Sequence, residues 1–334
     1  MKHALIVVAA FVLLPLVLSA SALGSPTRAQ DPLKAVTTLP DIAGLVATIG
    51  GDQVQVKAIC KGTENVHAVR LKPSHVVMTS RCDLFFQVGL SLEHAWVPGL
   101  IKTSRNRKIQ AGQPGLVTLS QGLAVLNVPA SLSRREGADL HPEGNPHVNL
   151  AHNAGRHMAA IIRDTLTRMR PEKKADFERR FKAFESQSLK AEARWAKLAS
   201  ALQGRKVIVY HTEFTYLLNN LGLEVIATIE PKPGVPPTPR HLTEVIQTAR
   251  KNPGVVILTA AWSNNRAVDR VVDAGKGKKL VLASMARTDQ SWLQSMEAMH
   301  VALAKAFEVP YGMEAEVKAT PEKPVDTDKK QTQS

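Results

Sequence analysis

The chain has 334 residues, of which 44% are apolar and only 4% aromatic, and its 43 Lys and Arg residues against 29 Asp and Glu give a formal net charge of +14. This composition excludes a disordered chain and a collagen-like repeat. The length is sufficient for two lobes, each able to bury a core without a metal ion or a disulfide. The positive residues are scattered and lack interleaved aromatic side chains, so the charge does not predict a nucleic-acid partner.

Residues 1–29 are typical of a signal peptide. Lys2 and His3 precede an apolar run of about 15 residues that ends in small residues. The run is shorter than the roughly 20 residues of a membrane-spanning helix, and no second run of that length follows. We therefore expect an exported protein that does not span the membrane, cleaved after Ala22 or after Ala29. No Cys lies near either position, so a lipid anchor on cysteine is not expected.

The chain has two cysteines, Cys60 and Cys82. In an oxidising compartment they are candidates for a disulfide that closes a loop of about 22 residues. The alternative is two buried free thiols, and the sequence leaves both possibilities open.

The first part of the exported chain alternates strand-like and helix-like segments. Residues 35–39 and 53–59 are predicted strands, and apolar spacing over 42–49 predicts a helix between them. A helix that begins at Pro73 leads to a mostly apolar strand over 84–88, which is typical of a strand buried on both faces. This alternation predicts a parallel α/β sheet.

A long loop and two helices follow. Residues 127–149 are rich in proline and glycine, and a long loop of this kind is a frequent location of binding residues. A helix is predicted over about 150–169. The next is predicted from Pro171 to about Leu202, with Leu189 among the apolar residues of its buried face. Such a helix is about 48 Å long and can hold two lobes apart.

Beyond the long helix the strand-helix alternation resumes and predicts a second α/β lobe. The predicted strands cover residues 207–210, 225–228, 255–258 and 280–282. Residues 312–334 offer little to bury and are predicted to be disordered.

Three of the eleven histidines lie where parallel sheets place ligands, past the carboxyl ends of predicted strands. His67 follows the second strand, His147 ends the long loop, and His211 directly follows the strand over 207–210. Neutral imidazole suits Zn, Cu, Ni or Fe, and three imidazoles leave one position of a tetrahedral zinc open. Each histidine alone is more simply a hydrogen-bonded loop residue, but their joint placement favours a metal site.

The motifs around these histidines resemble those of the periplasmic metal-binding proteins of zinc and manganese ABC importers. The similar segments are Val66-His67 with Pro73-Ser74, Asn145-Pro146-His147 and Tyr210-His211, and the runs 141–147 and 229–237 resemble one subgroup. The resemblance extends over about residues 35–310. It implies α/β architecture with two Rossmann-like parallel-sheet lobes joined by one long rigid helix, and a metal ion between the lobes.

The sequence departs from this family at the fourth ligand, which is usually an Asp or Glu of the second lobe. The corresponding positions hold Ala260, Asn264 and the neutral run 283–285. Without a carboxylate the site keeps the full charge of the metal, so we expect weaker binding or another group in the fourth place. The candidates are water and three side chains, His141, Glu64 and Glu213. Manganese prefers oxygen ligands and is disfavoured relative to zinc.

The sequence patterns and the resemblance together predict a five-part organisation of the chain. The parts are a signal peptide (1–29), an N-terminal α/β metal-binding lobe (33–170), a linker helix (171–203), a C-terminal α/β lobe (204–311) and a disordered tail (312–334). The predicted ligands are His67 and His147 from the first lobe and His211 from the second, with His141 as a further ligand or metal-collecting residue. The other histidines of the exported chain are interpreted as structural: His75, His94, His152, His157, His241 and His300.

The resulting hypothesis is a periplasmic, monomeric solute-binding protein, not an enzyme, that captures Zn²⁺ and delivers it to an ABC transporter permease. Protonation of imidazole or displacement of the lobes would favour release. One alternative is a family member with a degenerate site that binds another solute or a partner protein. A zinc hydrolase with three histidine ligands ranks lower, because no base, nucleophile or oxyanion donor set accompanies the histidines.

Overall fold

The computed structural model describes residues 30–130, 141–263 and 265–312. The signal peptide expected over 1–29 lies outside the described residues, and so do residues 313–334 of the predicted tail. The described residues from Pro32 to 312 form one compact unit. Among the described residues, every helix is too short or too polar to cross a lipid bilayer.

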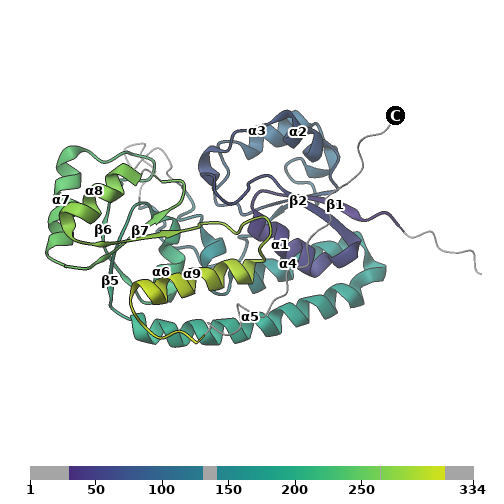
Figure 1. Ribbon diagram of the computed structural model, residues 1–334. Helices are drawn as coiled ribbons and strands as arrows, with labels where there is room; N and C mark the ends of the chain where they lie inside the picture. The colour runs from purple at the N-terminus through teal and green to yellow at the C-terminus, as the bar shows by residue number, and fades with distance from the viewer. Residues whose placement is uncertain (1–29, 131–140, 264, 313–334) are drawn as a thin grey trace, which may run out of the picture. The chain divides into compact units, whose positions relative to one another are not determined.

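The first lobe is a four-stranded sheet with the strand order β2-β1-β3-β4, in which every pair is parallel (Figure 1). Its short strands are rich in apolar residues, and all of β3 except its last residue is buried, as expected for a sheet covered on both faces. Its elements are β1 (Leu33–Thr37), α1 (Pro40–Gly50), β2 (Val54–Ala58), α2 (Pro73–Ser80), β3 (Leu84–Gln87), α3 (Val97–Ser104), β4 (Leu116–Thr118) and α4 (Ala154–Met169).

The second lobe repeats the same topology, because its order β6-β5-β7-β8 matches β2-β1-β3-β4 strand for strand, again with parallel pairs. In each lobe the chain reverses its direction of winding beside the first strand, and ligands bind past the carboxyl ends of strands at such a point. The elements are β5 (Lys206–Val209), α6 (Thr215–Asn220), β6 (Glu224–Thr228), α7 (Pro239–Arg250), β7 (Val256–Ala260), α8 (Asn265–Gly275), β8 (Lys278–Leu282) and α9 (Trp292–Ala306).

A single long helix, α5 (Lys174–Leu202), joins the two lobes after a short turn over Pro171–Lys173. The predicted helix is confirmed, but its buried face differs from the prediction at one position. Leu189 is 49% exposed, and the stripe passes instead through Ser188 and Ala191. Small residues occupy these positions because the helix packs closely against α1 and α4. The buried residues recur every three or four positions: Phe177, Phe181, Phe184, Ser188, Ala191, Trp195, Leu198 and Leu202.

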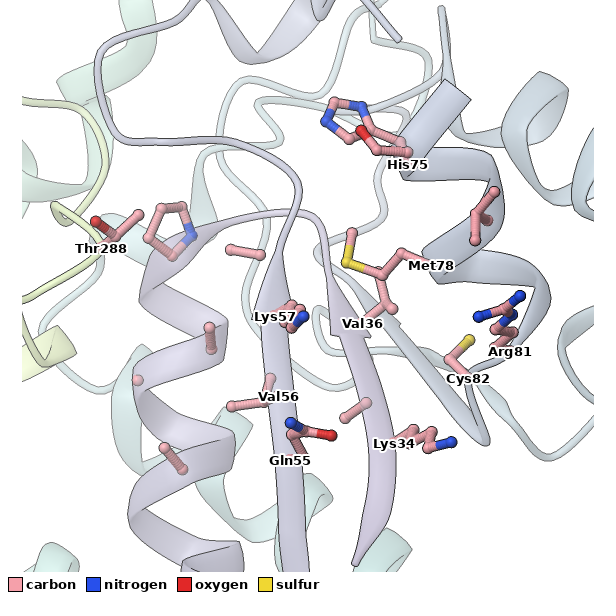
Figure 2. A pocket seen from close by; sticks show the side chains of 18 residues that line it. Lys34, Val36, Gln55, Val56, Lys57, His75, Met78, Arg81, Cys82 and Thr288 are labelled. Carbon is pink, nitrogen blue, oxygen red and sulfur yellow. The ribbon is translucent and has the colours of Figure 1, made fainter. Parts of the chain in front are cut away.

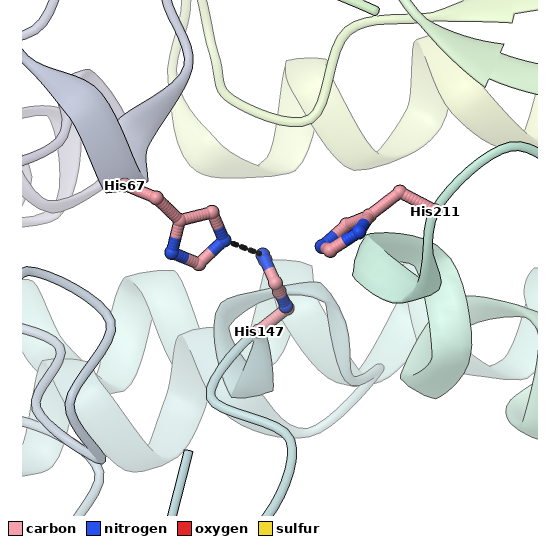
Figure 3. Close-up of side chains that lie close together, drawn as sticks. All are labelled: His67, His147 and His211. Carbon is pink, nitrogen blue, oxygen red and sulfur yellow. Dashed lines mark hydrogen bonds between the residues drawn. The ribbon is translucent and has the colours of Figure 1, made fainter. Parts of the chain in front are cut away.

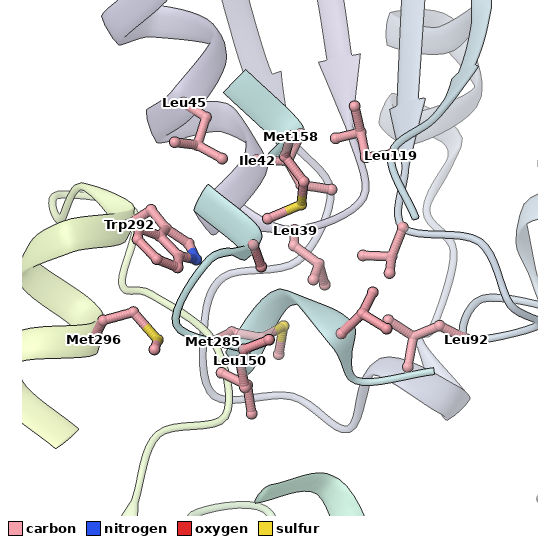
Figure 4. Packing of buried hydrophobic residues seen from close by; sticks show 14 of the residues in the cluster. Leu39, Ile42, Leu45, Leu92, Leu119, Leu150, Met158, Met285, Trp292 and Met296 are labelled. Carbon is pink, nitrogen blue, oxygen red and sulfur yellow. The ribbon is translucent and has the colours of Figure 1, made fainter. Parts of the chain in front are cut away.

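The last helix, α9, links the second lobe to the first, because it contacts β8, α5 and α1. Trp292 at its beginning is fully buried and belongs to the same hydrophobic cluster as Leu39 and Ile42 (Figure 4). A Cβ on Gly155 would lie 2.4 Å from the indole ring, so only glycine fits at that position. One hydrophobic cluster therefore extends through both lobes, and a smaller one fills the space between α7, α8 and the second sheet.

The structure has Cys60 and Cys82 as buried free thiols and not as a disulfide. Cys60 follows β2 at the carboxyl edge of the first sheet, whereas Cys82 precedes β3 at its amino edge. At about 3.3 Å per residue, the strand register separates the two by about 20 Å. This is well beyond the roughly 7 Å between Cα atoms that a disulfide allows.

We expect both thiols to be unreactive towards a disulfide reagent such as DTNB in the native protein and to react fully after unfolding in denaturant. Burial raises the pKa of Cys82 to about 12 and also raises the pKa of Cys60, so little thiolate is available for attack. A reaction of either cysteine in the native state, or an intact mass that indicates a disulfide, would contradict this arrangement.

Candidate metal centre

His67, His147 and His211 meet between the two lobes. Each offers one ring nitrogen, and these nitrogens all lie within 4.8 Å of one another. The Nε2 atoms of His67 and His147 are 3.2 Å apart. Two imidazole ligands of a tetrahedral zinc are separated by about the same distance, given Zn–N bonds of about 2.0 to 2.1 Å. Figure 3 shows the three rings turned towards one another from three separate segments.

His67 and His147, the two candidate ligands of the first lobe, are each held by a hydrogen bond to the side chain of an asparagine two residues earlier. The side-chain oxygen of Asn65 accepts a hydrogen bond of 2.9 Å from the backbone N–H of His67, and Asn145 does the same for His147 at 3.0 Å. Asn favours such bonds to the backbone two residues on, which stabilise a tight turn. In both Asn-x-His segments the asparagine therefore sets the direction of the histidine. His211 is positioned differently, because it lies two residues after the end of β5.

Two of the rings are oriented by hydrogen bonds at Nδ1. His147 Nδ1 lies 3.0 Å from Asn145 Oδ1, and His211 Nδ1 lies 2.7 Å from Glu230 Oε2. When Nδ1–H donates to these oxygens, the lone pair of Nε2 is available for a metal, which is the usual arrangement for a ligating histidine. The carboxylate of Glu230 also adds a negative charge next to the ligand set.

Glu230 was not singled out by the sequence reasoning. It follows β6, the strand next to β5, so its carboxylate reaches the carboxyl end of the strand that precedes His211. Gly234 N–H also donates to its Oε2 at 3.3 Å. Its position in the run 229–237, directly after a predicted strand, could have identified Glu230 as a candidate site residue.

The three ligand candidates are buried, with His67 4%, His147 5% and His211 3% exposed. Burial, with a further contribution from His211, lowers the pKa of His67 to about 3. Burial and the neighbouring histidines lower the pKa of His147 well below its ordinary value. These two rings are therefore neutral, the form that binds metal, even in mildly acidic solution.

No carboxylate joins the group of three histidines among the described residues. Of the positions expected to be acidic, Ala260 ends β7 and is fully buried, and Asn264 lies outside the described residues. Glu64 accepts a hydrogen bond from the backbone N–H of Lys61. Glu213 is 1% exposed, neither of its oxygens has a hydrogen-bond partner among the described residues, and burial raises its pKa.

His141 lies beside the three histidines and outside their group. Its ring centroid is 5.0 Å from that of His67, and its side chain is 7% exposed. His94, interpreted above as structural, also lies beside His141, at 5.8 Å between ring centroids. The structure thus places five imidazoles in one continuous cluster, of which three share a common centre.

A separate cavity of about 1010 Å³ lies along β2 and β1, beside α1 and α2 (Figure 2). Its lining includes the basic side chains of Lys34, Lys57 and Arg81 and the thioether of Met78, but none of the three histidines. The candidate metal centre is therefore not part of this cavity.

Two α/β lobes of equal topology, joined by one long helix and enclosing a buried cluster of imidazoles, define a two-lobe binding protein. Residues 35–306 match the family model of ZnuA, the periplasmic component A of zinc-uptake complexes, and the chain belongs to this family.

Among its relatives, the iron ABC transporter substrate-binding lipoprotein MtsA of Streptococcus pyogenes serotype M1 is 24% identical over 274 residues, which cover 80% of this chain and 83% of MtsA. The zinc-binding lipoprotein AdcA of Streptococcus pneumoniae strain R6 is 24% identical over 230 residues, which cover 67% of this chain but only 44% of AdcA.

Solved structures of the same fold include a crystal structure of ZnuA, with a TM-score of 0.68, 20% identity and coverage of 82% of this chain and 99% of that one. A Mn-bound periplasmic metal-binding protein from Candidatus Liberibacter asiaticus has a TM-score of 0.64 and 16% identity, with coverage of 82% and 98%. These two neighbours support the predicted α/β architecture with two lobes and a connecting helix.

Proposed function

We propose that this protein is the exported solute-binding component of an ABC metal importer, and that it captures Zn²⁺ between its lobes and delivers the ion to the permease. The observation that carries the proposal is the buried group of His67, His147 and His211, whose ring nitrogens all lie within 4.8 Å of one another. Relatives named as ABC transporter substrate-binding and zinc-binding lipoproteins support the same role and an extracytoplasmic location.

The donor set favours zinc over manganese. Three neutral nitrogens suit Zn²⁺, whereas Mn²⁺ prefers carboxylate, carbonyl and water oxygens, and the positions expected to supply such a carboxylate are neutral. We infer that water completes the coordination and that Glu230, through His211, offsets part of the metal charge. His141 and Glu213 are the remaining candidates for the fourth place.

Delivery follows from the origin of the ligands. His67 and His147 belong to the first lobe and His211 to the second, so a displacement of one lobe at the permease removes at least one ligand from the ion. Such a step requires no turnover chemistry. A transport role is therefore preferred to a zinc hydrolase, because Glu230, the carboxylate hydrogen-bonded within the site, is engaged by His211 Nδ1 and by the N–H of Gly234 and so orients a ligand rather than acting as a base.

Calorimetric titration of the metal-free protein with Zn²⁺, Mn²⁺ and Cu²⁺, without an affinity tag that contains histidine, tests the proposal. We expect one equivalent of Zn²⁺ to bind, and Mn²⁺ to bind at least about tenfold more weakly because of its preference for oxygen ligands. Absence of binding for all three ions would favour the degenerate-site alternative. Esterase or hydratase activity of the zinc-loaded protein would favour the hydrolase.

A further inference from the structure

A line of imidazoles connects the protein surface to the buried centre. The ring centroids of His94 and His141 are 5.8 Å apart, and those of His141 and His67 are 5.0 Å apart. His67 lies 5.1 Å from His147 and 5.8 Å from His211, and His147 lies 5.8 Å from His211, so the three inner rings form a triangle at the end of this line. Each ring therefore lies next to another that can accept the same metal ion.

Exposure decreases along this line. His94 is solvent-exposed, His141 is 7% exposed, and the three inner histidines are 3–5% exposed. A hydrated divalent ion cannot enter a centre this buried with its water shell intact. Stepwise replacement of waters by imidazoles lowers the barrier, because the ion never lies in a buried position without ligands.

His94 lies outside the centre, but its Nδ1 makes the kind of hydrogen bond that usually orients a metal-ligating histidine. Its Nδ1 lies 2.8 Å from the backbone carbonyl oxygen of Ser91, which can only accept, so Nδ1 carries the proton and Nε2 presents a lone pair. Ser91 Oγ also donates to Glu143 Oε2 at 2.9 Å. This bond ties the turn that contains His94 to the segment that contains His141.

We propose that His94 and His141 form an outer site, which binds a divalent transition metal transiently and passes it to the buried centre. The inference rests on the proposed function, because it describes how the ion reaches that centre. The outer site has two nitrogen ligands and is completed by water, so it binds metal more weakly than the centre. It acts on the rates of binding and release and not on the final affinity.

Stopped-flow measurement of Zn²⁺ association and dissociation, with a fluorescent chelator as competitor, tests the outer site. In His94→Ala we expect both rate constants to fall by about fivefold, with the equilibrium affinity unchanged, because a transient site lowers the same barrier in both directions. The matched control is His75→Ala on α2, outside the cluster, for which both rates should equal those of the wild type.

A second experiment measures metal binding at the outer site in a protein whose buried centre has lost His147. Cu²⁺, which binds imidazole strongly, is added to His147→Ala and to His147→Ala with His94→Ala, and the bound ion is followed by electron paramagnetic resonance. We expect weak nitrogen-coordinated Cu²⁺ in the first variant and its loss in the second, whereas adding His75→Ala instead of His94→Ala should preserve it.

Unchanged rates in His94→Ala would overturn the proposal. An increased dissociation rate with unchanged association would also overturn it, since His94 would then stabilise the final complex. Equal Cu²⁺ signals in the two double variants would show that His94 is not a ligand. Failure of the proposed function is a separate result, because it appears as absence of Zn²⁺ binding by the wild-type protein.

Discussion

Replacement of His147 by alanine is expected to weaken Zn²⁺ binding by more than about 100-fold. Removal of a group that only orients a metal ligand typically costs about 10- to 100-fold, and loss of the ligand itself should cost more. His147 is central to the group, with its Nε2 3.2 Å from that of His67 and its ring 5.8 Å from that of His211. The measurement is the dissociation constant from competition with a chelator of known affinity.

The same loss is expected for His67→Ala and His211→Ala, although the three residues lie in different parts of the chain. His157→Ala is the matched control, because this histidine also lies in the first lobe, on α4, but bonds to the backbone oxygen of Gln121. The control should bind zinc like the wild type. If all four variants bound zinc equally, the ion would be held elsewhere and the three histidines would have only a structural role.

Acidification is expected to destabilise the metal-free protein strongly. Burial lowers the pKa of His67 to about 3, of His152 to about 4 and of His300 to about 3, and the pKa of His147 is also well below its ordinary value. Below about pH 6.5 the unfolded chain binds protons at these histidines and the folded protein does not, so the free energy of unfolding falls as the pH falls. The expected loss at pH 5 is about 2 kcal/mol for each of His67, His152 and His300.

The buried acids partly oppose this effect. Burial raises the pKa of Asp41 to about 6, so the folded protein binds this proton more tightly than the unfolded chain and gains stability as the pH falls through that range. The histidines with a lowered pKa outnumber the buried acids with a raised pKa, Asp41, Glu93 and Glu213, so the net slope should retain the sign of the histidines. Urea unfolding at neutral pH and at about pH 5 measures the difference.

A variant isolates the contribution of one histidine pair. His152 Nε2 lies 2.9 Å from His300 Nε2, and the ring of His300 stacks on Trp195 at 4.5 Å between centroids. His152→Gln removes one titrating group, so its stability should depend less on pH than that of the wild type. His157→Gln serves as the matched substitution. Equal pH dependence in the wild type and in His152→Gln would mean that burial of His152 does not suppress its protonation.

The predictions of strands and helices agree with the structure where the spacing of apolar residues within one segment is enough to specify its secondary structure. The alternation of apolar strands with amphipathic helices predicted two parallel α/β lobes, and the start at Pro171 and the spacing of apolar residues predicted the helix up to Leu202. The error at Leu189 has a packing cause: three- to four-residue spacing permits several neighbouring stripes, and the close approach of α1 and α4 selected the one with small residues.

Relations between distant segments required the tertiary structure. Cys60 and Cys82 are close in sequence but lie at opposite edges of one sheet. Strands β2 and β3 run in the same direction, so Cys60 after the end of β2 and Cys82 before the start of β3 lie at opposite ends of the strands. Glu230 and His94 showed no motif of their own. Their importance comes from the neighbours that the fold provides: His211, next to Glu230, and His141, next to His94.

Composition, periodicity and short motifs were enough to predict the class of architecture, the family resemblance and the residue types available to a metal. The fold was needed to show which imidazoles share a centre, which carboxylate orients His211, and how His94 and His141 extend the cluster to the surface. The physical reason is that hydrogen bonds and metal coordination act over a few ångströms in space. Separation along the chain does not report such distances.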